Sequence, residues 1–97
     1  MEWWEFYKLR RAKVDQNQRE LVEYARSIGA TVTHLHSVGS GVPDILIGYN
    51  GSNYLAEIKN EKGKLNALQV KWFNNWSGQA RVIRTKEDIN DLLNIRV

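Results

Sequence analysis

The sequence contains no cysteine, and only one proline and one methionine, in 97 residues. Without cysteine the chain can form neither a disulfide nor a thiolate zinc site. No apolar run approaches the roughly 18 residues of a membrane span, and the N-terminus is charged and aromatic where a signal peptide would be apolar. We therefore expect an intracellular, cytoplasmic protein without a membrane-spanning segment.

No strong excess of one charge is present either, because 14 Lys and Arg side chains face 11 Asp and Glu side chains, for a net charge of +3. This mild excess favours an anionic partner but fits an ordinary solvated surface equally well. A hydrophobic content of 42% suits one compact domain with room for one core and one site. We divide the chain into an N-terminal extension, residues 1–14, and a single domain, residues 15–97.

The extension places aromatic residues ahead of a basic cluster that includes Lys8, Arg10 and Arg11. One interpretation is an arm that stacks on bases and binds phosphates of nucleic acid. The favoured interpretation is an extra helix whose aromatic side chains pack onto the domain or onto a second copy of the chain. Because exposed aromatics promote association, we expect a homodimer.

Residues 41–60 hold two short apolar runs, 45–47 and 54–56, separated by Asn50-Gly51-Ser52-Asn53. Asn-Gly is the strongest short hairpin signal, so the runs predict two antiparallel strands. Asp44 opens the first strand, whereas Glu57 and Lys59 share one face near the end of the second. These three groups could converge at one end of the sheet. Buried carboxylates are costly unless paired or bound to a metal, and two within reach form the oxygen-rich site that Mg²⁺ prefers.

The remaining elements follow from caps and hydrophobic periodicity. We predict a helix over 17–28 with Asp15 as its N-cap, a strand over 31–36, a helix over 67–76 capped by Asn66, a strand over 80–84 and a helix capped by Thr85. In the helix over 67–76, Leu68, Trp72 and Trp76 form an apolar row, and Gln69 leans toward the same, buried side.

Pro43-Asp44, followed after twelve residues by Glu57-Ile58-Lys59, resembles the motif of PD-(D/E)XK nucleases. The order of elements is similar to theirs over residues 15–95, and Lys64-Leu65-Asn66-Ala67-Leu68-Gln69 resembles a Lys-Leu-X-X-X-Gln feature of the VRR-NUC-like branch. The resemblance extends to small Holliday-junction-resolvase-like nucleases. It implies an α/β fold of order α-β-β-β-α-β-α, with a central mixed four-stranded sheet flanked by helices.

The resemblance also implies roles for residues. Asp44, Glu57 and the backbone carbonyl of Ile58 would bind Mg²⁺, with Mn²⁺ as a substitute, and Lys59 would orient or deprotonate the attacking water. Gln69 would position that water or Lys59, although a capping box between Asn66 and Gln69 explains the glutamine equally well. Asn17 or Glu20 of the first helix would touch a metal-bound water or a second metal, unless each is an ordinary surface residue.

We therefore predict a metal-dependent endonuclease that hydrolyses DNA phosphodiester bonds. Selectivity for branched DNA is favoured over sequence readout because so short a chain has little recognition surface. The alternative is a non-catalytic nucleic-acid-binding or assembly module that keeps the nuclease fold. The loop 37–41 lacks the Lys-Ser/Thr of a P-loop, so no nucleoside triphosphate is expected. Candidate DNA contacts are Lys8, Arg10, Arg11, Ser40, Lys62 and Lys64.

Overall fold

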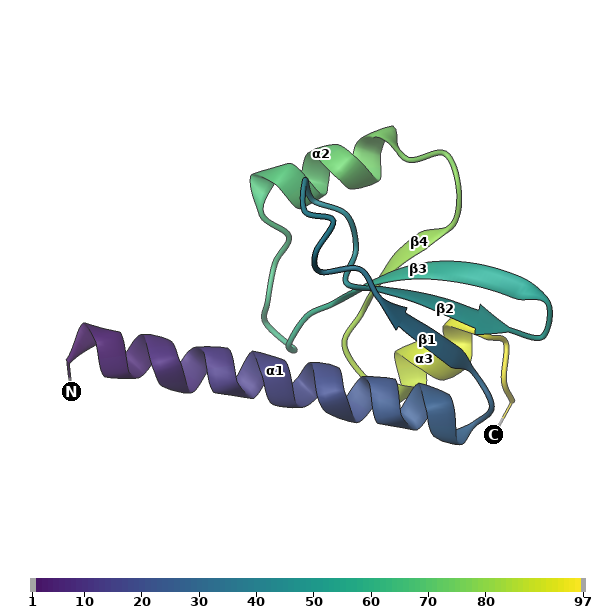
Figure 1. The fold of residues 1–97 in the computed structure, drawn as a ribbon, viewed down its shortest axis with the longest axis horizontal. Coiled ribbons are helices and arrows are strands. Elements are labelled where there is room, and N and C mark those ends of the chain that lie inside the picture. Colours follow the sequence, from purple (N-terminus) through teal and green to yellow (C-terminus); the bar gives the residue numbers. More distant parts are fainter. Residues whose placement is uncertain (1, 97) are drawn as a thin grey trace.

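A computed structural model describes the backbone of residues 2–96 and the side chains of residues 2, 5 and 16–96. The chain forms a four-stranded sheet with helices on both sides (Figure 1). In chain order the elements are α1 Trp3–Ser27, β1 Thr31–His34, β2 Ile45–Tyr49, β3 Ser52–Ile58, α2 Ala67–Asn75, β4 Ala80–Ile83 and α3 Lys86–Leu92. This α-β-β-β-α-β-α order confirms the predicted fold class.

The strands lie in the order β1-β2-β3-β4. β1 and β3 each pair with β2 in antiparallel fashion, and β3 pairs with β4 in parallel, so the sheet is mixed as predicted. Parallel neighbours need a crossover connection, and α2 lies within it. β1 ends at His34, two residues before the predicted boundary, so His36 follows the strand.

The β2–β3 hairpin turns on two residues only. Asn50 and Gly51 both have positive φ, 50° and 80°, as a type I′ turn requires, and Tyr49 pairs with Ser52. The predicted four-residue separation was therefore too long, because positions 52 and 53 belong to β3. Ile45 pairs with Ala56, so the same register continued by one residue places Asp44 opposite Glu57. Opposed residues of an antiparallel pair lie on the same face of the sheet.

The other face carries the core. Alternate residues of β2 and β3 point toward α1 and α3, which lie together on one side of the sheet (Figure 1). The buried core consists of Leu21, Val22, Ala25, Ala30, Ile45, Ile47, Ala56, Ile58, Ile83, Ile89, Leu92 and Leu93. The period of two therefore leaves the Asp44 and Glu57 positions on the face toward α2.

α1 is one helix of 25 residues, so the predicted start at residue 17 and the capping role of Asp15 were wrong. No proline or glycine occurs in residues 3–15, and an aspartate alone does not end a helix. The N-terminal half of α1 extends past the sheet (Figure 1). Among the described helices, α1 alone has the length to span a membrane, and it is too polar to do so. The extension's aromatic side chains and Lys8, Arg10 and Arg11 lie outside the described side chains.

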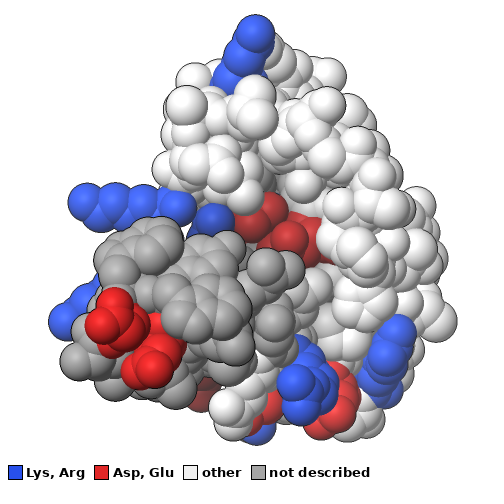
Figure 2. Space-filling view, turned by 60° about the vertical axis from the view of Figure 1, so that its left-hand side comes forward, with Lys and Arg blue, Asp and Glu red and all other residues white. Residues whose placement is uncertain are grey.

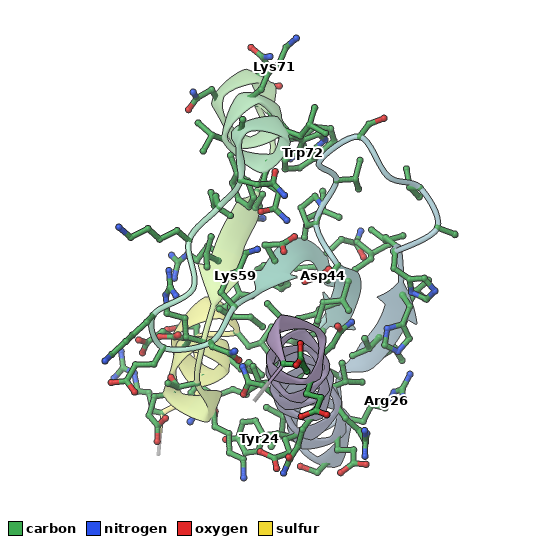
Figure 3. The ribbon with its side chains drawn as sticks, turned by 90° about the vertical axis from the view of Figure 1, so that its left-hand side faces the viewer. Tyr24, Arg26, Asp44, Lys59, Lys71 and Trp72 are labelled. Carbon is green, nitrogen blue, oxygen red and sulfur yellow. The ribbon has the colours of Figure 1, made fainter. Side chains whose placement is uncertain are left out.

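α2 differs from its predicted environment. It lies on the opposite side of the sheet from α1, beyond the end where β2 begins and β3 finishes (Figures 1 and 3). None of its residues is buried, and Leu68 and Trp76 are 61% and 46% exposed. The expectation of a buried apolar row was wrong because the crossover carries α2 away from the hydrophobic face of the sheet.

Candidate active site

Asp44, Glu57, Lys59 and Gln69 line one pocket of about 530 Å³ on the α2 side of the sheet. Figure 2 shows acidic side chains at the bottom of a hollow, next to a basic one. In Figure 3, Asp44 and Lys59 lie on neighbouring segments below α2. The structure thus brings the predicted residues together at the end of the sheet, and their catalytic roles stay predictions.

Asp44 is held by backbone contacts on both of its sides. Its Oδ2 accepts a hydrogen bond of 2.9 Å from the backbone N–H of Ile58, and its carbonyl accepts one of 2.8 Å from the N–H of Leu35. Pro43 before it is fully buried and fixes its own φ. Oδ2 is thereby committed to the backbone, which leaves Oδ1 to face another ligand.

Glu57 is only 2% exposed, an unusual environment for a carboxyl group. Its Oε2 accepts a hydrogen bond of 3.0 Å from Gln69 Nε2 and lies 3.6 Å from Lys59 Nζ. Its Oε1 is buried and has no hydrogen-bond partner among the described atoms. A buried polar atom without a partner costs free energy, so a proton or a cation bound to this oxygen would stabilise the site.

Burial and the neighbouring Asp44 carboxyl raise the pKa of Glu57 to about 7, while the Lys59 ammonium opposes the shift. A proton therefore relieves repulsion between the two acids, and a divalent cation would relieve it in the same way. Two carboxylates with the adjacent Ile58 carbonyl are hard oxygen ligands of the kind that Mg²⁺ binds. In the part of the chain that the structure describes, no cluster of three or more acidic or histidine side chains adds to this pair.

Gln69 makes the predicted capping contacts, and it also contacts Glu57, which the sequence interpretation did not predict. Its side-chain Oε1 accepts from the Asn66 N–H at 2.9 Å, and its own N–H donates to Asn66 Oδ1 at 2.9 Å, which confirms the capping box. Its Nε2 donates to Glu57 Oε2. The cap therefore orients the amide that fixes the glutamate.

The two first-helix candidates separate in the structure. The Asn17 side chain donates to the backbone carbonyl of Lys59 at 3.1 Å and so ties α1 to the end of β3. Glu20 is exposed and accepts from Gln16 instead of lining the pocket. Gln18, which the sequence interpretation missed, lines the pocket. Its signal was the four-residue spacing to buried Val22, which shares its helix face.

Lys62 and Lys64 also line this pocket, from the loop after β3. That loop is fixed by Arg84, whose Nη1 donates to the carbonyls of Asn60 and Gly63 at 2.6 Å each. No motif or spacing in the sequence indicates this positioning role for Arg84. Ser40 lies apart from the pocket and lines another hollow beside α2.

Comparison with known proteins supports the fold. A scan against protein-family models and a search of the curated proteins give no match. A solved structure described as a VRR_NUC domain is similar with a TM-score of 0.69 and 21% sequence identity, over 88% of this chain and 98% of that one. The chain therefore has the fold of that VRR_NUC domain.

Proposed function

We propose that this chain, which has the fold of a VRR-NUC domain, is a metal-dependent endonuclease that hydrolyses phosphodiester bonds in DNA. The observation that carries the proposal is the buried Oε1 of Glu57, which has no partner among the atoms that the structure describes and lies beside a second carboxylate and an ammonium. The free energy lost when charged groups are removed from water exceeds the attraction that they gain in such an arrangement, so the arrangement does not stabilise the fold by itself. The same arrangement suits a site that binds a cation.

The carboxylates of Asp44 and Glu57, with the Ile58 carbonyl, would hold Mg²⁺, and Mn²⁺ would serve as a substitute. When bound, the metal supplies Lewis-acid neutralisation of phosphate charge and a lowered pKa for water. The cause of the raised Glu57 pKa, which is burial next to another acid, supports this assignment. A bound cation would offset the repulsion between the Asp44 and Glu57 carboxylates and would give Oε1 of Glu57 a partner.

The chain's other residues act around these ligands. The ammonium of Lys59, 20% exposed, can donate to a water or to a phosphate oxygen and stabilise the negative charge that grows during hydrolysis. The side-chain amide of Gln69 donates a hydrogen bond to Oε2 of Glu57, so Oε1 of Glu57 is directed away from that amide. Asn17 holds the backbone at Lys59 and so fixes where that side chain begins.

The lysines at positions 62 and 64 place positive charge beside the carboxylates, which suits the phosphate backbone of DNA. We include selectivity for branched DNA in the proposal, because the chain has little surface for reading sequence. We also include a homodimer, which the aromatic residues of the extension favour and which would present two sites to two strands. We also include an intracellular location, associated with nucleic acid, in the proposal.

The first prediction concerns Asp44→Asn. We expect this change to reduce Mg²⁺-dependent cleavage at least about a hundredfold, while the free energy of unfolding stays near or above that of the wild type because repulsion between the acids falls. Cleavage is read on labelled branched and linear DNAs by gel electrophoresis.

Asp91→Asn serves as the matched control, because Asp91 is an exposed carboxylate on α3. Cleavage by Asp44→Asn at the wild-type rate would remove Asp44 from the site. DNA binding by the wild type without cleavage in either metal would instead support the non-catalytic module.

A further inference from the structure

α2 exposes an apolar surface on the side of the candidate site. We call the side chains of Leu68, Trp72 and Trp76 the α2 surface. Together with Ser40, Lys71 and Asn75 they line a pocket of about 310 Å³. Leu68 and Trp76 are 61% and 46% exposed, although both are large and apolar. Exposed apolar groups gathered in one hollow indicate an interaction site.

The two indole rings of this surface form a stack. The centroids of Trp72 and Trp76 lie 4.8 Å apart with an interplanar angle of 19°, and Phe73 contacts Trp72 edge-on at 5.2 Å. A Cβ at Gly78 would lie 2.8 Å from Nε1 of Trp76, so the absence of a side chain lets the backbone at Gly78 pack closely against that indole. Proteins that bind single-stranded nucleic acid stack its bases on aromatic rings, and a partly exposed ring at the end of a stack suits this role.

Charge and position favour a nucleic acid as the occupant. Lys71 is exposed and lines the same pocket, so a cation accompanies the rings. Gln69, three residues before Trp72 on the same helix, contacts Glu57. The α2 surface therefore continues from the candidate active site, and Figure 3 shows Lys71 and Trp72 on α2 above Asp44 and Lys59. A strand that reached Lys59 would carry its neighbouring nucleotides toward α2.

We propose that the α2 surface receives an unpaired nucleobase of the DNA strand, stacked on Trp76, with Lys71 near the adjoining phosphate. The inference rests on the proposed function for the identity of the ligand as DNA. It narrows the substrate class to DNA with unpaired nucleotides next to the bond that is cut. A base inside a duplex already has both faces covered, and extruding it costs free energy.

The experiment measures binding in EDTA, so that cleavage plays no part. The probes are a labelled single-stranded DNA and a strand of equal length and charge whose central nucleotides are abasic. We expect the full-length wild type to bind the base-bearing strand about five- to tenfold more tightly. Trp76→Ala should lose this preference and keep its affinity for the abasic strand, while Trp76→Phe should keep most of it.

Val70→Ala is the matched control, because Val70 is on α2, 42% exposed and not part of the pocket lining. Equal wild-type affinity for the two strands would overturn the inference, and so would equal weakening of both by Trp76→Ala. Light scattering tests the competing occupant: a dimer that Trp76→Ala makes monomeric, with the base preference unchanged, would assign the surface to a second copy. If the wild type bound the base-bearing strand more tightly than the abasic strand but cleaved no DNA, only the proposed function would be rejected.

Discussion

The Glu57 carboxyl group is buried, and one of its oxygens has no hydrogen-bond partner among the described residues, so folding favours its protonated form. Its pKa rises from the usual 4.5 to about 7, first through burial and then through Asp44. Because the folded state binds the proton more tightly than the unfolded chain, this group's stabilisation is complete below about pH 4.5 and disappears as the pH rises through about 7.

The second prediction follows from that sign. In EDTA, the free energy of unfolding of the wild type should fall by about 2 kcal/mol relative to Glu57→Gln between about pH 5 and pH 8. Urea denaturation at a series of pH values measures the difference. Glu61→Gln, which changes an exposed carboxylate, should follow the wild type. If the free energy of unfolding varied with pH in the same way for the wild type and for Glu57→Gln, burial would not raise the pKa of Glu57.

The third prediction separates the two contacts of Gln69. Gln69→Glu keeps an oxygen for the Asn66 N–H but replaces the amide that donates to Glu57 with a carboxylate. We expect kcat/KM to fall about tenfold or more, and its pH profile to move upward because another negative charge raises the pKa of Glu57.

Asn66→Ala is the matched change for the cap alone. It should cost about 1 kcal/mol of stability and leave the pH profile in place. A Gln69→Glu variant with the wild-type pH profile would restrict Gln69 to its capping role.

At the scale of elements, the sequence predicted best what depends on neighbouring residues. The Asn66–Gln69 capping box and the Thr85 cap form as expected, the latter within a capping box with Asp88, because each is complete within four residues. The hairpin also forms around Asn50-Gly51. Had that turn been interpreted as two residues, the register would have placed Asp44 opposite Glu57 from the sequence alone.

The start of α1 was missed for a local reason, whereas the other misses depend on packing between distant segments. Asp15 is compatible with a cap and with a helix interior, and the uninterrupted residues before it decide in favour of the interior. Asn17 and Gln18 point about 100° apart on the helix, and only the position of β3 shows which of them lines the pocket. An amphipathic pattern shows that α2 has an apolar side, but not whether the same chain covers it.

The fourth prediction concerns the loop that leads to Asp44. Gly41 has φ +80°, and a Cβ there would collide with the backbone carbonyl of Leu68, whereas a Cβ at Gly39, which has φ +73°, would meet no described atom within 4 Å. Gly41→Ala should therefore destabilise the fold by at least about 1 kcal/mol more than Gly39→Ala, which pays only for its backbone conformation.

The two variants are compared by urea denaturation and by cleavage. Cleavage should fall more in Gly41→Ala, because the loop places Asp44 relative to α2. Equal losses of stability would mean that the loop can move away from α2 at little cost.

At the scale of the whole molecule, the core that stabilises the fold and the candidate site lie on opposite sides of the sheet. One face packs against α1 and α3 and holds the buried aliphatic core, and the candidate site occupies the other side, below α2. Arg84 and Asn17 reach around to fix the loop and the strand end that carry the lysines. Changes to the carboxylates should therefore alter metal binding and cleavage without unfolding the core.

The fifth prediction tests this separation through Mg²⁺. A ligand present at ten times its Kd stabilises the folded state by about 1.4 kcal/mol, which corresponds to a rise in Tm of roughly 6–11 °C for a domain of this size. Thermal denaturation should show such a rise for the wild type and for Asp91→Asn, but not for Asp44→Asn. The rise should be larger at pH 8 than at pH 6, because the proton on Glu57 must leave before the metal binds. A wild-type Tm that Mg²⁺ and Mn²⁺ leave unchanged at pH 8 would reject the metal site while leaving the fold as described.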